Sequence, residues 1–121
     1  MLSRIIAARN IWAENLNKSN VNAIINCYKK NAVFKGTMSD DVSYDRDGLE
    51  KYFEELLGKN PSVHFIQSTI TETDTNLVLD TGVYIFVIGD KTVKANYQFV
   101  YDAEHRKPLI ISHFSGKMCD D

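Results

Sequence analysis

Apolar residues recur at helical spacing in the first third of the chain and predict two helices, each with one buried face. The first helix covers residues 2–16, where an apolar stripe includes Trp12. Either Ser19 or Asn20 can cap the second helix through a side-chain oxygen. The apolar positions of these stripes are Leu2, Ile5, Ile6, Trp12, Ala13, Leu16, Val21, Ile24, Ile25 and Tyr28.

A third helix follows a short apolar segment at residues 32–34 and a polar loop. Asp47 and Glu50 have the spacing of a capping box, so we expect the helix to begin there. Gly58 and Pro61 end it, because neither residue favours continuation of a helix. Its stripe is Leu49, Tyr52, Phe53, Leu56 and Leu57.

The second half of the chain changes to an alternating pattern rich in Val, Ile, Thr, Tyr and Phe, which predicts strands. Short turn segments separate the strands and favour an antiparallel meander. Gly82 lies in the middle of the second strand, so we expect a bulge or bend there. The predicted strands are residues 62–73, 77–88, 92–102 and 109–115.

Two of these strands differ in how their faces are patterned. The strand at 92–102 places aromatic residues on one face and polar residues, including Asn96 and Gln98, on the other. The strand at 77–88 is apolar on both faces and must be covered on both. Since the helices can cover only one face, we expect self-association as a homodimer or higher homo-oligomer through the outer face. Its candidate interface residues are Asn96, Gln98 and Val100.

Composition narrows the class of protein. A chain of 121 residues with 44% hydrophobic and 25% charged residues predicts one globular domain, residues 1–121. The balance of 14 basic and 16 acidic residues argues against nucleic-acid binding, and no apolar run could cross a membrane. Arg4 and Arg9 interrupt any signal peptide, and the two cysteines, Cys27 and Cys119, suit a cytoplasmic protein. A disulfide between those cysteines remains an alternative.

Four segments carry a resemblance to a known family. Trp12 followed by residues 28–34 (YKKNAVF) resembles the opening of nuclear transport factor 2-like (SnoaL-like) proteins. Residues 80–86 (DTGVYIF), 95–101 (ANYQFVY) and 110–116 (IISHFSG) resemble D-T-G-x-Y-x-F, A-R-Y-T-F-V-Y and I-V-x-H-H-S-S. The last three patterns are similar to those of one branch of the superfamily, which contains the calcium/calmodulin-dependent protein kinase II association domain and its small bacterial relatives.

The resemblance implies an α+β fold, a cone-shaped curled antiparallel sheet (a cystatin-like roll) packed on three N-terminal helices. It also marks differences within the motifs. Asn96 replaces the arginine of A-R-Y, and Phe114 replaces the second histidine of H-H-S-S. We therefore expect weak binding of anions at these motif positions, because amides hold a carboxylate less strongly than guanidinium does.

A cone of this type can enclose a ligand pocket lined by inward aromatic and polar groups. The alternative is that these groups form a plain aromatic core. His113 is either a general base or, with more support, a buried hydrogen-bonded histidine. Asp80 is either an acid of raised pKa or a partner for backbone amides near Gly82. The pocket candidates are Trp12, Tyr28, Asp80, Tyr84, Tyr97, Phe99 and His113.

Other chemistry has less support in the sequence. The acidic stretch formed by Asp40, Asp41, Asp45 and Asp47 lacks the spacing of a calcium loop, and Asp45 and Asp47 can serve as helix caps, so we expect a solvated loop and no metal. No phosphate-binding or nucleophile motif occurs, and no cofactor is expected. Two functions remain: a self-associating domain with a possible apolar or aromatic ligand pocket, or an isomerase, cyclase or lyase acting on a small apolar substrate.

Overall fold

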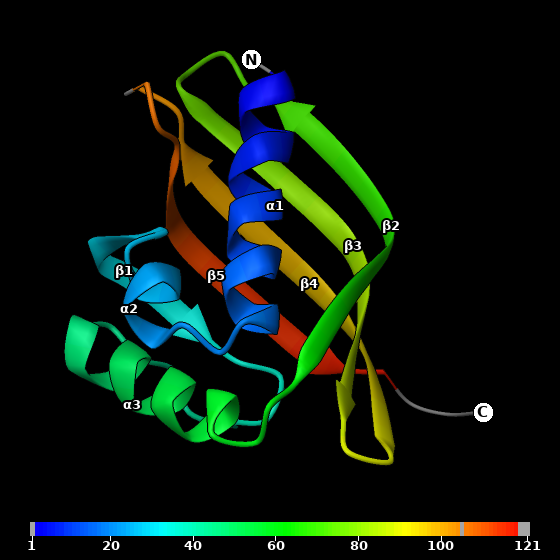
Figure 1. The fold of residues 1–121 in the computed structure, drawn as a ribbon. Coiled ribbons are helices and arrows are strands. Elements are labelled where there is room, and N and C mark those ends of the chain that lie inside the picture. Colours follow the sequence, from blue (N-terminus) through cyan, green and yellow to red (C-terminus); the bar gives the residue numbers. More distant parts are fainter. Residues whose placement is uncertain (1, 105, 119–121) are drawn as a thin grey trace.

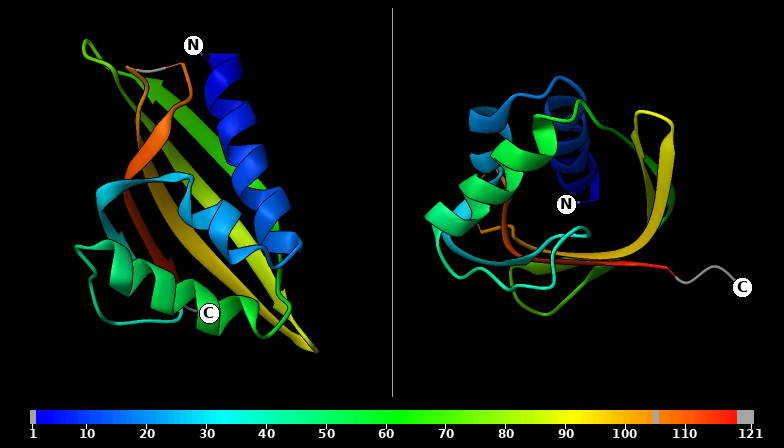
Figure 2. Two further views of the ribbon diagram at one scale, coloured as in Figure 1. Left: turned by 60° about the vertical axis from the view of Figure 1, so that its left-hand side comes forward. Right: turned by 90° about the horizontal axis from the view of Figure 1, so that it is seen from below.

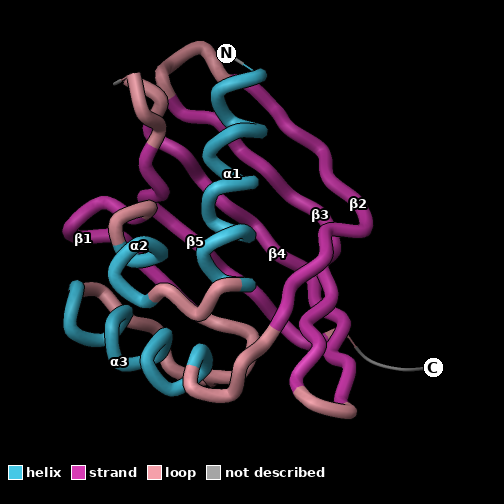
Figure 3. The backbone as a smooth tube through the Cα atoms, in the orientation of Figure 1, coloured by secondary structure: helices cyan, strands magenta, loops and turns pink. Residues whose placement is uncertain are grey.

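The computed structural model describes residues 2–104 and 106–118, which form three helices and five strands (Figure 1). Figure 3 shows the loops that join them. Cys119, and with it the alternative of a disulfide to Cys27, lies outside the described residues, and Cys27 is a free, buried thiol. The elements are α1 (Leu2–Asn17), α2 (Val21–Ile25), β1 (Tyr28–Lys35), α3 (Arg46–Leu57), β2 (Ser62–Glu72), β3 (Leu77–Ile88), β4 (Lys91–Asp102) and β5 (Leu109–Lys117).

The strands form one sheet in the order β1-β5-β4-β3-β2. The antiparallel meander from β2 to β5 confirms the sequence prediction. The apolar segment at 32–34 belongs to the longer strand β1, which pairs in parallel with β5 and makes the sheet mixed. Figure 2 shows that the sheet curls around α1 and that the three helices lie on the same, concave face. The α+β class is therefore confirmed.

The helix starts follow local hydrogen bonds. The side chain of Asn20 caps α2 by accepting a hydrogen bond from the backbone N–H of Ala23 at 3.1 Å. Of the two predicted caps of α3, Asp45 is confirmed, because its side chain accepts from the backbone N–H of Gly48 at 2.9 Å. The predicted cap at Asp47 is wrong, because the helix begins at Arg46. Asp47 lies in the first turn, where its charge complements the helix dipole.

The end of α3 also differs from the prediction in detail. Gly58 is the C-terminal cap, but it keeps a right-handed conformation with φ −62°. The chain enters the left-handed region at Asn60, whose φ is 52°. Asparagine tolerates this conformation better than most residues, so the reversal before Pro61 does not need the glycine.

The predicted bulge at Gly82 is wrong, because Gly82 pairs regularly with Ser68 of β2 and Tyr97 of β4. The irregularities of the antiparallel pairs lie at Ile66 of β2, next to β3, and at Ile111 of β5, next to β4. A side chain at Gly82 would collide with the backbone carbonyl of Gln67. The glycine therefore allows β2 to fold closely over β3 beside the bulge.

The hydrophobic core lies between the helices and the concave face of the sheet. Trp12 and Leu16 of α1 and Phe53 of α3 are buried there. No helix among the described residues is long and apolar enough to span a membrane. The opposite face carries no helix from the described part of the chain (Figure 2). We call it the outer face; it includes Thr81 and Val83 of β3, Asn96, Gln98 and Val100 of β4, and Phe114 of β5.

Candidate functional site

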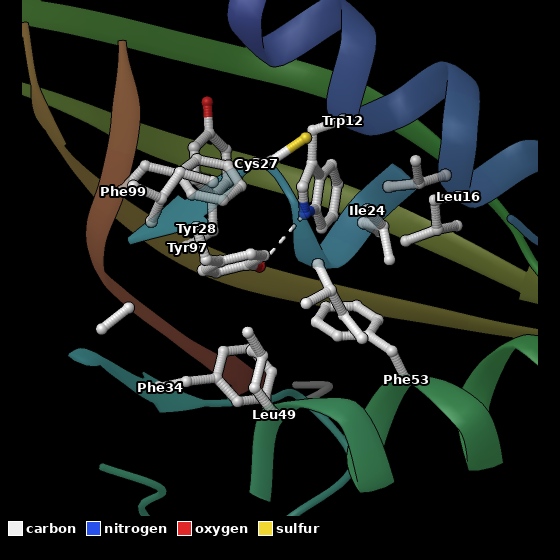
Figure 4. Packing of buried hydrophobic residues seen from close by; sticks show 14 of the residues in the cluster. Trp12, Leu16, Ile24, Cys27, Tyr28, Phe34, Leu49, Phe53, Tyr97 and Phe99 are labelled. Carbon is white, nitrogen blue, oxygen red and sulfur yellow. Dashed lines mark hydrogen bonds between the residues drawn. The ribbon is translucent and has the colours of Figure 1, made fainter. Parts of the chain in front are cut away.

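The structure brings the predicted pocket residues into one cluster between α1 and the sheet. Figure 4 shows part of it, with Trp12 of α1 beside Tyr28 of β1 and Phe99 of β4. Strand alternation places Tyr97 and Phe99 on the concave face of β4 together with Ala95 and Tyr101, as the sequence predicted. The cluster is Trp12, Tyr28, Asp80, Tyr84, Tyr97, Phe99 and His113.

His113 is held at both ring nitrogens. The Tyr28 hydroxyl lies 2.7 Å from Nδ1, and the Tyr84 hydroxyl lies 3.1 Å from Nε2. Tyr28 also accepts a hydrogen bond from the indole Nε1 of Trp12 at 3.1 Å, the dashed line in Figure 4. The three aromatic side chains therefore fix the position and the rotation of the imidazole.

Burial makes His113 a neutral group. Its side chain is almost fully buried, and desolvation lowers the pKa of His113 to about 3. The ring packs against Phe99 with the ring centroids 4.2 Å apart. An imidazole in this state neither carries a positive charge at neutral pH nor meets solvent, so the arrangement has the character of a buried hydrogen-bond network.

The aromatic rings fill the space between α1 and the sheet. Trp12 stacks on Tyr84 with an interplanar angle of 4°, and Tyr84 stacks on Tyr97 with centroids 4.8 Å apart. Burial raises the pKa of Tyr97 to about 12 and raises that of Tyr28 well above its ordinary value. These phenols are therefore protonated hydrogen-bond donors at neutral pH.

Asp80 has different partners from those that we expected. Its carboxylate, fully buried on β3, accepts hydrogen bonds from Ser68 Oγ at 2.7 Å and from the Tyr97 hydroxyl at 2.9 Å. Arg9 of α1 forms an ion pair with it at 3.4 Å and lies over the Phe65 ring. All three of these partners are side chains and none is a backbone amide near Gly82, so the predicted role of Asp80 towards those amides is wrong.

Arg9 is the residue that sequence reasoning missed at this cluster. It stands four residues after Ile5 and three before Trp12, within the buried stripe of α1. A charged residue at such a position needs a buried partner, because an isolated charge in the core is costly. That spacing, together with an aspartate in an apolar strand, could have indicated the Arg9–Asp80 pair.

The predicted interface residues lie on the outer face, where a shallow hollow of about 640 Å³ crosses the centre of the sheet. Asn96 and Gln98 of β4 line it together with Phe114, whose exposed fraction is 39%. Val100 follows on the same face and is half-buried. Lys35 is the one charged residue among the described residues that line the hollow, and its Nζ donates to the Ser115 carbonyl at 2.9 Å.

The acidic stretch between β1 and α3 does not form a metal site in the described part of the chain, where no group of three or more His, Cys, Asp or Glu side chains could hold a metal ion. Asp45 serves as the cap of α3. Asp40 and Asp41 are exposed in the preceding loop.

Solved structures show which proteins this chain resembles. A protein from Xanthomonas campestris, named for a calcium/calmodulin-dependent protein kinase II association domain, is 31% identical over 97% of this chain and 87% of its own, with a TM-score of 0.89. A nuclear transport factor 2-like protein of unknown function from Pseudomonas putida is 14% identical over 98% of this chain and 87% of its own, with a TM-score of 0.85.

A third similar structure, from Novosphingobium aromaticivorans, is named for scytalone dehydratase; it is 10% identical over 98% of this chain and 84% of its own, with a TM-score of 0.79. No family model and no curated protein matches the sequence. The fold is common to all three structures, and the identity to the Xanthomonas protein extends over nearly the whole chain. The chain therefore belongs to the nuclear transport factor 2-like superfamily, in the branch of calcium/calmodulin-dependent protein kinase II association-domain-like proteins.

Proposed function

We propose that this protein is a self-associating domain that forms a homodimer or a higher homo-oligomer through its outer face. The observation that carries the proposal is the surface of β3, β4 and β5 opposite the helices. Val83 and Phe114 lie there beside Asn96 and Gln98, without a covering helix in the described part of the chain. Such a mixture of apolar and uncharged polar groups is typical of the centre of protein interfaces.

A second copy of the same chain fits the chemistry of this face. In a two-fold symmetric dimer the interface is formed by the same surface patch of both copies. The side-chain amides of Asn96 and Gln98 contain both donors and acceptors, so they can pair with their own copies. A face rich in one charge would repel itself instead. The name of the Xanthomonas relative, an association domain, supports the same function.

The ligand-pocket part of the proposal concerns the cluster around Trp12 and Tyr28. A ligand there would have to displace stacked rings, since the side chains of Trp12, Tyr28 and Tyr84 are almost fully buried.

The catalytic alternative has one point of support, which is the scytalone dehydratase name of a structure with the same fold. At 10% identity, however, the similarity to that structure shows a common fold and no common activity. Asp80, the carboxylate of the aromatic cluster, is already engaged by Arg9, Ser68 and Tyr97. We therefore favour association over catalysis, and a cytoplasmic location remains part of the proposal.

A charge substitution tests the interface. In a two-fold dimer Gln98→Lys would bring lysines towards each other or bury a charge without a partner, so we expect dissociation to monomers without loss of fold. Asn22→Lys adds the same charge at an exposed position of α2 and is the matched control. The molar mass of each variant is measured by light scattering, and circular dichroism checks the fold. Equal oligomer masses for both variants would contradict an interface at Gln98.

A further inference from the structure

A second hollow, of about 200 Å³, lies on the helix side of the molecule, away from the outer face and from the centre of the aromatic cluster. It is formed by the first turns of α1, the turn between α2 and β1, the end of β4 and the segment that precedes β5. Its walls are mainly apolar and are formed by Ala7, Ala8, Ile11, Cys27, Tyr101 and Pro108.

Tyr101 is the unusual residue in the wall of this hollow. The Tyr101 side chain is 1% exposed, and its buried hydroxyl has no hydrogen-bond partner among the described residues. Each of the other three buried tyrosines of the sheet, Tyr28, Tyr84 and Tyr97, has one. A buried hydroxyl without a partner is costly, and a ligand that accepts its proton would remove that cost.

Positive charge surrounds the mouth of the same hollow. Arg4, Arg106 and Lys107 line it, and no acidic residue is among the described lining residues. The Arg4 guanidinium donates to the backbone carbonyls of Ala103 and Arg106 at 3.3 and 3.2 Å, which fixes the segment after β4 against α1. Arg106 and Lys107 themselves are exposed. The hollow therefore combines a basic rim, an apolar wall and a buried donor.

We propose that this hollow binds a small organic carboxylate. The apolar part of the ligand packs on Ala7, Ala8 and Ile11, and the carboxylate accepts a hydrogen bond from the Tyr101 hydroxyl within the field of Arg106 and Lys107. An inorganic anion would satisfy the charges but leave the apolar wall uncovered, and a neutral apolar molecule would not use the rim. The site uses none of the outer-face residues, so it is independent of self-association.

The test uses benzoate as the probe and benzamide as an uncharged probe of nearly the same shape. Binding to the full chain is measured by isothermal titration calorimetry and by amide chemical shifts in NMR spectra. We expect benzoate to bind more tightly than benzamide, to shift the amides of Ala7, Ala8 and Cys27, and to weaken as salt is added. Inorganic phosphate is the third probe, and we expect it to bind more weakly than benzoate.

Variants show whether benzoate binds in this hollow or at another basic part of the surface. Tyr101→Phe removes the hydroxyl alone and should weaken benzoate binding at least about tenfold, because a hydrogen bond to a charged acceptor is lost. The same variant should leave the melting temperature unchanged or raised, since the hydroxyl has no hydrogen-bond partner among the described residues. Lys107→Gln should also weaken binding, whereas Lys30→Gln, at an exposed position of β1, is the matched control and should not.

The following results would overturn the proposal. No binding of benzoate at millimolar concentration overturns it, as does equal affinity of the wild type and Tyr101→Phe. Equal affinity for benzoate and benzamide, or tighter binding of phosphate, contradicts the ligand class. Shifts confined to residues of the outer face or of the aromatic cluster contradict the location.

Discussion

The hydroxyl of Tyr28 at the start of β1 and Nδ1 of His113 in β5 are 2.7 Å apart. The indole nitrogen of Trp12 can only donate, so the Tyr28 oxygen accepts from it and the Tyr28 proton points to Nδ1. Nε2 then carries the proton of the neutral ring and donates to the Tyr84 hydroxyl. In this arrangement each of the four side chains has a partner, which makes the network a structural part of the core.

Removing the central hydroxyl tests the network. Tyr28→Phe leaves Trp12 Nε1 and His113 Nδ1 without a partner in a buried site. We expect the free energy of unfolding to fall by about 2–4 kcal/mol, the cost of two unsatisfied buried groups. Tyr44→Phe, at a residue that is 68% exposed, is the matched control and should have no measurable effect. Urea unfolding measures both; equal stabilities would show that the hydrogen bonds contribute little.

The lowered pKa of His113 predicts how stability depends on pH. The folded pKa of about 3 lies below the ordinary value of 6.5, so the unfolded chain binds the proton more readily. The contribution of His113 to stability is therefore fully present above pH 6.5 and falls as the pH decreases towards about 3. Each pH unit in this window costs about 1.4 kcal/mol.

The variant His113→Gln isolates that dependence. It removes the titrating group but keeps donors and acceptors for Tyr28 and Tyr84. We expect the loss of stability between pH 7 and pH 5 to be smaller in the variant than in the wild type, although the variant starts less stable. Urea unfolding at the two pH values gives the difference. The same loss in both proteins would mean that His113 does not control this window.

The Arg9–Asp80 pair predicts an asymmetric response to mutation. Asp80→Leu leaves the largely buried Arg9 without its carboxylate partner, so we expect a loss of about 3–5 kcal/mol in the free energy of unfolding. The double variant Arg9→Met/Asp80→Leu removes both charges and should be more stable than Asp80→Leu alone. Chemical unfolding of the two variants measures this difference. If the double variant is the less stable one, the unpaired charge of Arg9 is not the cause of the stability lost in Asp80→Leu.

Gly82 and Gly116 predict opposite outcomes for the same substitution. A methyl group at Gly82 would collide with the Gln67 carbonyl, whereas one at Gly116 would meet open space. Gly82→Ala should therefore lower the melting temperature strongly or prevent folding, and Gly116→Ala should leave it nearly unchanged. Thermal unfolding compares them. A stable Gly82→Ala protein would show that β2 can move away from β3 without cost.

Much of the fold could be predicted from the sequence because the spacing of apolar residues in each segment is typical of either a helix or a strand. The stripe through Trp12 and Leu16 and the alternation through Tyr97 and Phe99 each place one face in the core. The parallel pairing of β1 with β5 was not predictable in this way. The pairing joins two strands that are far apart in the sequence, and no local pattern at residues 32–34 encodes it.

The candidate site shows the same division. Residue pattern was sufficient to select the side chains that face the interior, because strand alternation fixes their direction. Their partners depend on contacts distant in sequence, such as Tyr28 with His113 and Arg9 with Asp80. The hydroxyl of Tyr101, which has no partner among the described residues, could not be found from the sequence, because strand alternation gives the direction of a side chain but not the contacts of its hydroxyl.

The molar mass of the wild-type protein in solution tests the central claim most directly. Self-association through the outer face predicts a mass of at least twice the 13.8 kDa of one chain, measured by sedimentation equilibrium at micromolar concentration. It also predicts that Gln98→Lys shifts the mass towards one chain while Asn22→Lys does not. A wild-type mass of 13.8 kDa throughout this concentration range would contradict self-association as the function of this domain.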